Sequence, residues 1–204
     1  MGRQSLDKVR IKDPKKREVW IKQLMPIFFE HGIKEISPNR IAAEINKSKA
    51  TVYKHFDSHK EVVMLIIEMK LTSLQKFSPL LEDESVSYPD RYQKTVEYVS
   101  TELKDVGTVF LSDLKAVYPD LWELISAFKK FAINELRSFY IKGVKAKVFA
   151  DISPDLLAKS DELFFDILTD ADYLKSKGLT LKTAFEEYFK MRFNGILNQE
   201  SVRV

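Results

Sequence analysis

Side chains suited to touching a nucleic acid are concentrated between Ser48 and Phe56. Long polar side chains reach base edges or phosphates, and small ones let a helix approach the bases closely. The segment supplies both kinds, in Ser48, Lys49, Ala50, Thr51, Tyr53, Lys54 and His55. On a helix, Val52 and Phe56 fall on the opposite side and turn inward. This pattern predicts a short helix that contacts DNA through its outer face.

Other chemistry lacks its residues in this sequence. The absence of cysteine excludes a disulfide framework and a thiolate zinc site. No Gly-rich phosphate loop, G-x-S-x-G elbow or Glu-x-x-His pair occurs. His55 and His59 are four residues apart, but Phe56-Asp57-Ser58 should separate two helices, so we do not expect a shared metal. We therefore expect no enzyme, no cofactor and no metal.

Helices should position the segment from Ser48 to Phe56. The 204-residue chain has only 6 Gly, no clear period-2 alternation and many apolar residues at i, i+3 and i+4. These features predict an all-α fold. Pro26, inside the first helix, should produce a kink or a solvent-facing bend. The predicted helices cover residues 15–31, 39–45, 49–56, 59–77, 89–105, 108–117, 119–142, 154–175 and 180–198, with residues 78–89 as a linker.

Two sets of turn residues frame the helix pair at 39–56. Ser37-Pro38 is typical of an N-cap followed by proline at the first helical position. Asn46 tolerates a positive φ, and Ser48 can accept a hydrogen bond from the free N–H groups of the next helix. Two short helices joined by a tight turn and braced by a longer one predict a helix-turn-helix.

Positive charge is concentrated at the N-terminus. Residues 1–60 hold 14 Lys/Arg and 7 Asp/Glu, although the whole chain has a net charge of only +3. A phosphate-binding module joined to a different module gives this asymmetry, but so does a solvated basic tail. We expect a basic arm and helix-turn-helix domain at 1–60 and a helical effector-binding and dimerisation domain at 61–204.

Residues 17–65 resemble the DNA-binding domain of the tetracycline-repressor (TetR) family. Phe28 and Gly32 have the family's F-x-x-x-G spacing, Ile41-Ala42 matches its I-A pair, and residues 48–56 resemble S-K-G-T-L-Y-x-Y-F. The chain differs at Asn46 and Lys47, where the family has glycine and a small apolar residue. Together with the turn residues, the resemblance implies DNA contacts from Ser37, Asn39, Arg40, Lys47, Ser48, Lys49, Ala50, Thr51, Tyr53, Lys54, His55 and Lys60.

For the remaining two thirds, the resemblance implies a helical domain whose last two long helices form a four-helix bundle with a second subunit. The predicted interface residues are Leu163, Phe164, Ile167, Phe185, Tyr188, Phe189 and Phe193. An effector pocket is usually mostly apolar. Candidate lining residues are Phe110, Tyr118, Trp122 and Phe165, although an aromatic stripe at helical spacing is more often core.

The function expected from these features is that of a transcriptional regulator, a repressor that binds a palindromic operator as a homodimer and is released by an unknown small molecule. An activator, or a helical interaction protein with the same fold, remains an alternative. No window approaches the about 18 uninterrupted apolar residues of a membrane span, and the charged N-terminus lacks the apolar stretch of a secretory signal. We therefore expect a cytoplasmic protein without a membrane partner.

Overall fold

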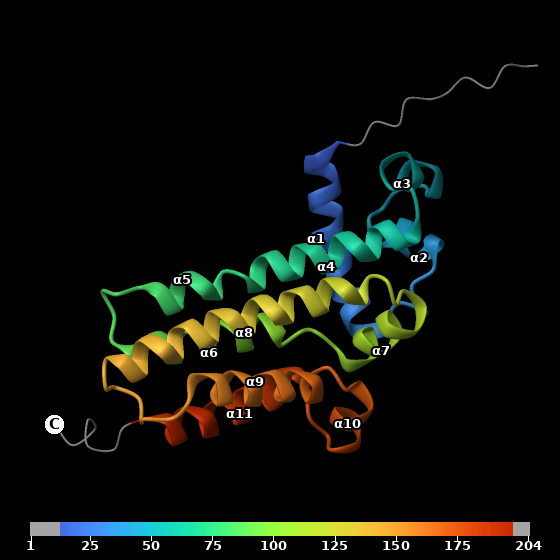
Figure 1. The fold of residues 1–204 in the computed structure, drawn as a ribbon. Coiled ribbons are helices and arrows are strands. Elements are labelled where there is room, and N and C mark those ends of the chain that lie inside the picture. Colours follow the sequence, from blue (N-terminus) through green and yellow to red (C-terminus); the bar gives the residue numbers. More distant parts are fainter. Residues whose placement is uncertain (1–12, 198–204) are drawn as a thin grey trace, which may run out of the picture.

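The computed structural model describes residues 13–197, which form eleven α-helices (Figure 1). Within residues 13–197, the only β-type pairing is one antiparallel bridge between Phe149 and Leu197. The predicted all-α fold is confirmed. The basic arm predicted at residues 1–12, and residue 198 of the last predicted helix, lie outside the described residues. The helices are α1 (Pro14–His31), α2 (Pro38–Glu44), α3 (Lys49–His55), α4 (His59–Leu74), α5 (Phe77–Glu82), α6 (Tyr88–Leu103), α7 (Thr108–Val117), α8 (Trp122–Lys145), α9 (Pro154–Leu168), α10 (Ala171–Ser176) and α11 (Leu181–Ile196).

Helix α1 is delimited by its caps. The Asp13 carboxylate accepts hydrogen bonds from the N–H groups of Lys15 and Lys16, at 3.1 and 3.3 Å. At the other end, Gly32 has φ 81°, a left-handed conformation that glycine adopts without steric cost. The helix continues through Pro26, whose side chain is exposed. The proline therefore costs α1 a backbone hydrogen bond without disturbing the core.

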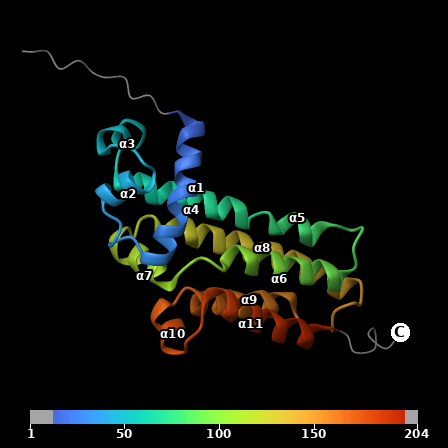
Figure 2. The same ribbon diagram turned by 180° about the vertical axis from the view of Figure 1, so that it is seen from behind.

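The long helices stack in three layers, which Figures 1 and 2 show from opposite sides. Helices α4 and α5 form one outer layer, α6 and α8 the middle, and α9 and α11 the other outer layer. Helices α1, α2 and α3 lie together at one end of α4. One continuous apolar core extends from Trp20 in α1 to Ile196 in α11. The predicted domain boundary at residues 60 and 61 falls in the first turn of α4. This helix joins the helix-turn-helix part to the C-terminal part.

Two predictions of secondary structure were wrong. The predicted linker at 78–89 contains α5, because Phe77 and Leu81 are buried and hold the segment against the core. The single helix predicted at 154–175 is two helices. The Thr169 hydroxyl bonds back to the Phe165 carbonyl at 2.9 Å, and the Asp170 carboxylate caps α10 by accepting the Tyr173 N–H at 2.9 Å. Both side chains satisfy backbone groups locally and so favour a break.

A buried polar cluster joins α8, α9 and α11. Asp161, fully buried in α9, accepts hydrogen bonds from the hydroxyls of Tyr140 and Tyr188 at 2.6 and 2.8 Å. Its other partner is Arg192, whose Nε lies 3.2 Å from the carboxylate. Burial raises the pKa of Asp161, against the opposing effect of these partners. The cluster fixes how the three helices pack, because removing one partner leaves a buried polar group unpaired.

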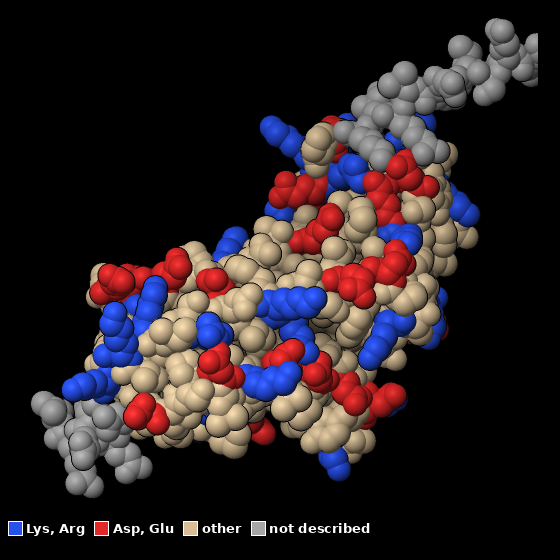
Figure 3. All heavy atoms as spheres, in the orientation of Figure 1, with Lys and Arg blue, Asp and Glu red and all other residues tan. Residues whose placement is uncertain are grey.

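Over residues 13–197, no helix is long and apolar enough to cross a membrane. On the face shown in Figure 3, basic and acidic side chains are interspersed over the surface.

Candidate nucleic-acid interface and ligand cavity

The turn between α2 and α3 has the geometry that its residues predict. Asn46 adopts φ 51°, and the Lys47 N–H donates to the Ala42 carbonyl at 2.9 Å. The Ser48 hydroxyl then accepts the Thr51 N–H at 3.1 Å and so caps α3. Ser37 caps α2 in the same way, by accepting the Arg40 N–H at 3.3 Å. The turn therefore holds two short helices in a helix-turn-helix arrangement.

Helix α3 has one buried and one open face. Val52 and Phe56 are buried, and the Phe56 ring packs against Trp20 of α1, with 6.2 Å between ring centroids. The cations on α3 and in the turn before it stay in solvent. Of the predicted DNA-contacting residues, Ser37, Asn39, Lys47, Ser48, Lys49, Ala50 and Lys54 are exposed, and Arg40, Thr51 and Tyr53 are half-buried. These ten residues, called the α3 surface below, are placed where a duplex could reach them.

His55 is placed differently from the sequence prediction. Its ring is buried, with its edge against Trp20 at 4.8 Å between centroids. Its Nδ1 has no hydrogen-bond partner within the described part of the chain. Because the imidazole packs into the α1–α3 contact, it does not face outward, and we leave His55 out of the α3 surface.

Lys60 also points away from the α3 surface. Its Nζ lies 2.5 Å from the Asp120 carboxylate and 5.9 Å from the centroid of the Tyr118 ring. Both partners belong to the turn between α7 and α8. The side chain therefore ties the start of α4 to the C-terminal part, and we do not retain it as a phosphate contact.

His59 forms the centre of this junction. Its Nε2 donates to the Ile36 carbonyl at 2.8 Å, because a carbonyl can only accept. Its Nδ1 is then the acceptor for the Tyr118 hydroxyl at 2.9 Å. Burial lowers the pKa of His59 by more than the Ile36 bond raises it, so the neutral form is favoured. The sequence around His59 gives no sign of this role, because its two partners lie 23 and 59 residues away.

Asp113 of α7 makes a second connection between the two parts. Its Oδ2 accepts the N–H groups of Ile33 and Lys34 at 2.9 and 3.0 Å, and its Oδ1 lies 2.9 Å from the Lys34 ammonium. Burial opposes the carboxylate charge, but these partners outweigh it and lower the pKa of Asp113. A Cβ on Gly32 would lie 2.5 Å from Asp113 Oδ2, so glycine is required there. Helix α7 thus holds the segment between α1 and α2.

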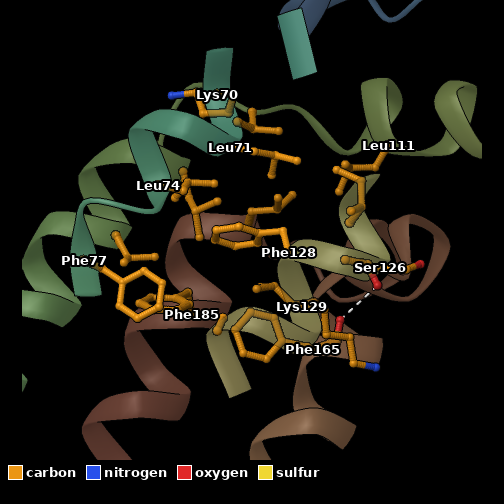
Figure 4. A pocket seen from close by; sticks show the side chains of 18 of the residues that line it. Lys70, Leu71, Leu74, Phe77, Leu111, Ser126, Phe128, Lys129, Phe165 and Phe185 are labelled. Carbon is orange, nitrogen blue, oxygen red and sulfur yellow. Dashed lines mark hydrogen bonds between the residues drawn. The ribbon is translucent and has the colours of Figure 1, made fainter. Parts of the chain in front are cut away.

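A cavity of about 270 Å³ lies inside the C-terminal part, enclosed mainly by α4, α6, α7, α8, α9 and α11 (Figure 4). Of the predicted pocket residues, Phe110, Trp122 and Phe165 line it, and Tyr118 lies outside it at the His59 junction. Most lining side chains are apolar, as in ligand sites generally. They include Phe29, Ile67, Leu71, Leu74, Phe77, Val96, Val99, Phe128, Leu136 and Leu168.

Five of the predicted interface residues have their principal contacts within the subunit. Phe164, Phe185 and Phe189 are buried, and the last two line the cavity. Tyr188 stacks on Phe164 at 3.7 Å between centroids, and Phe193 stacks on Tyr92 at 4.7 Å. The aromatic stripe of α11 faces inward because this helix packs against α6 and α9. The assignment of the buried Phe164, Phe185 and Phe189 to a second subunit therefore conflicts with their positions, whereas Tyr188 and Phe193 are half-buried and stay predicted interface residues.

Leu163 and Ile167 remain on the outer side of α9, with 56% and 44% of their surface exposed. Two further exposed apolar residues lie in this layer, Leu156 of α9 and Met191 of α11, at 61% and 66%. Leu156, Leu163, Ile167 and Met191 are called the outer apolar residues below. On α9 they share one face, since they are separated by seven and four positions.

No family model matches the sequence. Among curated proteins, the chain is 22% identical over 163 residues to the Bacillus subtilis HTH-type transcriptional regulator YvaF, covering 79% of this chain and 86% of that one. It is 28% identical over 145 residues to an HTH-type transcriptional regulator of Staphylococcus aureus, covering 71% of this chain and 68% of that one. Neither relative is named as an enzyme, in agreement with the expectation from sequence.

Solved structures share the fold at low sequence identity. A Saccharomonospora viridis regulator in complex with choline has a TM-score of 0.72 at 16% identity, covering 92% of this chain and 100% of that one. The TetR-family regulator PfmR of Thermus thermophilus has a TM-score of 0.64 at 18% identity, covering 86% of this chain and 97% of that one. FadR of Bacillus subtilis, in complex with stearoyl-CoA, has a TM-score of 0.63 at 13% identity, covering 87% of this chain and 97% of that one. The chain therefore has the fold of the TetR family of transcriptional regulators, and its curated relatives are HTH-type transcriptional regulators.

Proposed function

We propose that this protein is a cytoplasmic, DNA-binding transcriptional regulator whose helix α3 enters the major groove. The observation that carries the proposal is the division of α3 into two faces. Val52 and Phe56 anchor it to the core, while Lys49 and Lys54 are exposed. A recognition helix needs this combination of a rigid support and an open polar face.

Within the α3 surface, two kinds of contact are expected. Lys49, Ala50, Thr51 and Lys54 approach base edges, where they discriminate sequence. Ser37 and Tyr53 contact phosphates, with Asn39, Arg40 and Lys47 beside them at the start of α2 and in the turn. The Ser48 hydroxyl already bonds to the Thr51 N–H and hydroxyl. Its main role is therefore to hold the N-terminal end of α3 in position.

The active species is a homodimer formed through the outer apolar residues of α9 and α11. A soluble protein gains stability by covering large exposed apolar side chains, and a twofold pairing brings the same patch of each subunit together. Two copies of α3 would then reach successive major grooves about 34 to 36 Å apart, which calls for a palindromic operator.

Release by an effector follows from the elements that connect the cavity to α3. Helix α4 lines the cavity with Ile67 and Leu71 and carries His59 at its other end. Helix α7 lines it with Phe110 and holds Ile33 through Asp113. A ligand that fits the cavity better when α4 or α7 has shifted would change the spacing of the two α3 helices and lower operator affinity, so the protein acts as a repressor.

Selection of bound sequences from a random duplex DNA pool tests this function. The selected site should be palindromic with half-sites one helical turn apart, and titration should give two chains per site. A protein that enriches no sequence at low salt, or a site bound by a single chain, would refute the proposal.

A further inference from the structure

One polar side chain on the cavity lining lacks a partner. Thr95 of α6 is 95% buried, with 5% relative exposure, and its Oγ1 makes no hydrogen bond to any described residue. Two other lining hydroxyls are satisfied by their own helices: Ser126 donates to the Trp122 carbonyl at 3.3 Å and Thr169 to the Phe165 carbonyl at 2.9 Å. A buried hydroxyl without a partner is costly, so Thr95 is suited to bonding a ligand.

All but one of the charged lining side chains are already compensated. Lys70 Nζ lies 2.9 Å from the Glu102 carboxylate, and Lys129 pairs with Asp166. Glu162 lies 2.7 Å from Lys159 Nζ. Lys130 is the remaining charged lining residue, and its side chain is exposed to solvent. A charged ligand group would therefore lose its hydration inside without gaining a free counter-charge.

Two of the aromatic lining residues already have a cation beside their rings. Lys115 Nζ already lies 5.2 Å from the centre of the Trp122 ring, and Lys70 Nζ lies 5.8 Å from that of Phe29. A second cation at either ring would be repelled by the first. Cation–π attraction, the usual means of holding a quaternary ammonium, is weakened accordingly.

Tyr92 also lines the cavity, and its hydroxyl lies beside the Tyr140 hydroxyl and the Asp161 carboxylate. Burial, and then the nearby Asp161 carboxylate, raise the pKa of Tyr92, so it stays protonated and uncharged. The lining thus offers a ligand apolar surface and neutral hydroxyl groups.

We propose that the cavity binds an uncharged, mainly apolar molecule with one hydroxyl or carbonyl group that hydrogen-bonds to Thr95. The inference rests on the proposed effector site and names the chemical class of its ligand. At about 270 Å³ the cavity is near the lower limit of ligand pockets, roughly 300 Å³. The ligand is therefore compact, either a medium-length chain or a small ring system.

Three probes with one alkyl chain and different head groups separate the possibilities. The full-length protein is titrated calorimetrically with 1-octanol below its solubility limit, and with octanoate and octyltrimethylammonium below their micelle concentrations. Octanol should bind at least about tenfold more tightly than either ion, because each ion would lose the hydration of its charged group. Tighter binding of octanoate or of octyltrimethylammonium, or no binding of octanol, would overturn the proposal.

Two isosteric variants test the role of Thr95. Thr95→Val should weaken octanol binding about fivefold to tenfold, since one hydrogen bond is lost. Thr169→Val, whose hydroxyl lines the same cavity but bonds to its own helix, should change it less than twofold. Without ligand, Thr95→Val should unfold at the wild-type temperature or above it, because an unpaired hydroxyl is removed. Equal octanol affinities for the two variants would contradict the assignment.

Operator binding is titrated separately, without any probe. Failure of that titration rejects the proposed function and leaves the octanol result unaffected. Failure of the octanol titrations with intact operator binding rejects only the ligand class.

Discussion

The Tyr118 hydroxyl and the His59 imidazole meet at 2.9 Å and join the end of α7 to the start of α4. The same imidazole donates to the Ile36 carbonyl, in the segment that leads into α2. Three elements are therefore linked through one ring. Because α4 and α7 also line the cavity, this ring lies on the physical connection between the cavity and the helix-turn-helix.

Removing the Tyr118 hydroxyl should loosen this junction. Tyr118→Phe leaves His59 Nδ1 without its donor, and we expect the free energy of unfolding to fall by about 1 to 2 kcal/mol. Urea denaturation measures the change. Tyr173→Phe is the matched control, because Tyr173 is exposed and its hydroxyl makes no hydrogen bond to residues 13–197. Equal stability of the two variants would show that the His59–Tyr118 bond carries no net energy.

Stability should fall as the pH is lowered through the titration of His59. Its folded-state pKa lies below the unfolded value of about 6.5, so the unfolded chain takes up the proton first. Below about pH 6.5 the free energy of unfolding should decrease by up to roughly 1.4 kcal/mol per pH unit, until the folded pKa is reached. Denaturation curves of the wild type and of His59→Gln, compared at each pH, isolate this contribution. Parallel pH dependences for the two proteins would contradict it.

The buried Asp113 should contribute more to stability than acidic residues at the surface. Asp113→Asn loses the ion pair with Lys34 and weakens the bonds to the Ile33 and Lys34 N–H groups, so a loss of about 2 kcal/mol in unfolding free energy is expected. Thermal and urea unfolding measure it. Asp105→Asn, at an exposed side chain 4.0 Å from Lys104, should change stability by less than about 0.5 kcal/mol. A stable Asp113→Asn protein would mean that α7 does not hold the loop after α1.

The proposed dimer should depend on the exposed side of α9. Leu163→Glu and Ile167→Glu together place charges among the outer apolar residues, and sedimentation should then show monomers with unchanged helix content. Val19→Glu is the control, since Val19 is 61% exposed on α1, away from that layer. An unaltered assembly in the double variant would place the dimer interface elsewhere.

The helix-turn-helix could be predicted from sequence because its signals are local. Ser37-Pro38, Asn46 and Ser48 act within a few residues, and the structure has the caps and the positive φ that they predict. His55 could not be placed in this way, because its partner Trp20 is far away in the sequence. Lys60 was predicted to contact a phosphate but pairs with Asp120, which is also far away in the sequence.

In the C-terminal part, the periodicity of apolar residues predicted the helices, but it did not show whether an apolar helix face packs in the core or at an interface. Phe185 and Phe189 have the spacing of an interface as well as of a core, and tertiary packing places them around the cavity. The Asp161 cluster could not be predicted from sequence. Its members come from α8, α9 and α11, and no local pattern around any one of them indicates the others.

The salt dependence of binding to the selected operator tests the role of α3 most directly. Lys49→Ala/Lys54→Ala should bind about 1 to 3 kcal/mol more weakly per lost base contact. Because each ammonium group in the groove also displaces counterions from the neighbouring phosphates, the slope of log affinity against log salt should fall by up to about 0.9 per lysine. Lys142→Ala/Lys145→Ala removes the same charge from exposed positions at the end of α8 and should keep the wild-type slope. If the α3 variant retains wild-type affinity and slope, or if both pairs weaken binding equally, α3 is not the helix that reads DNA.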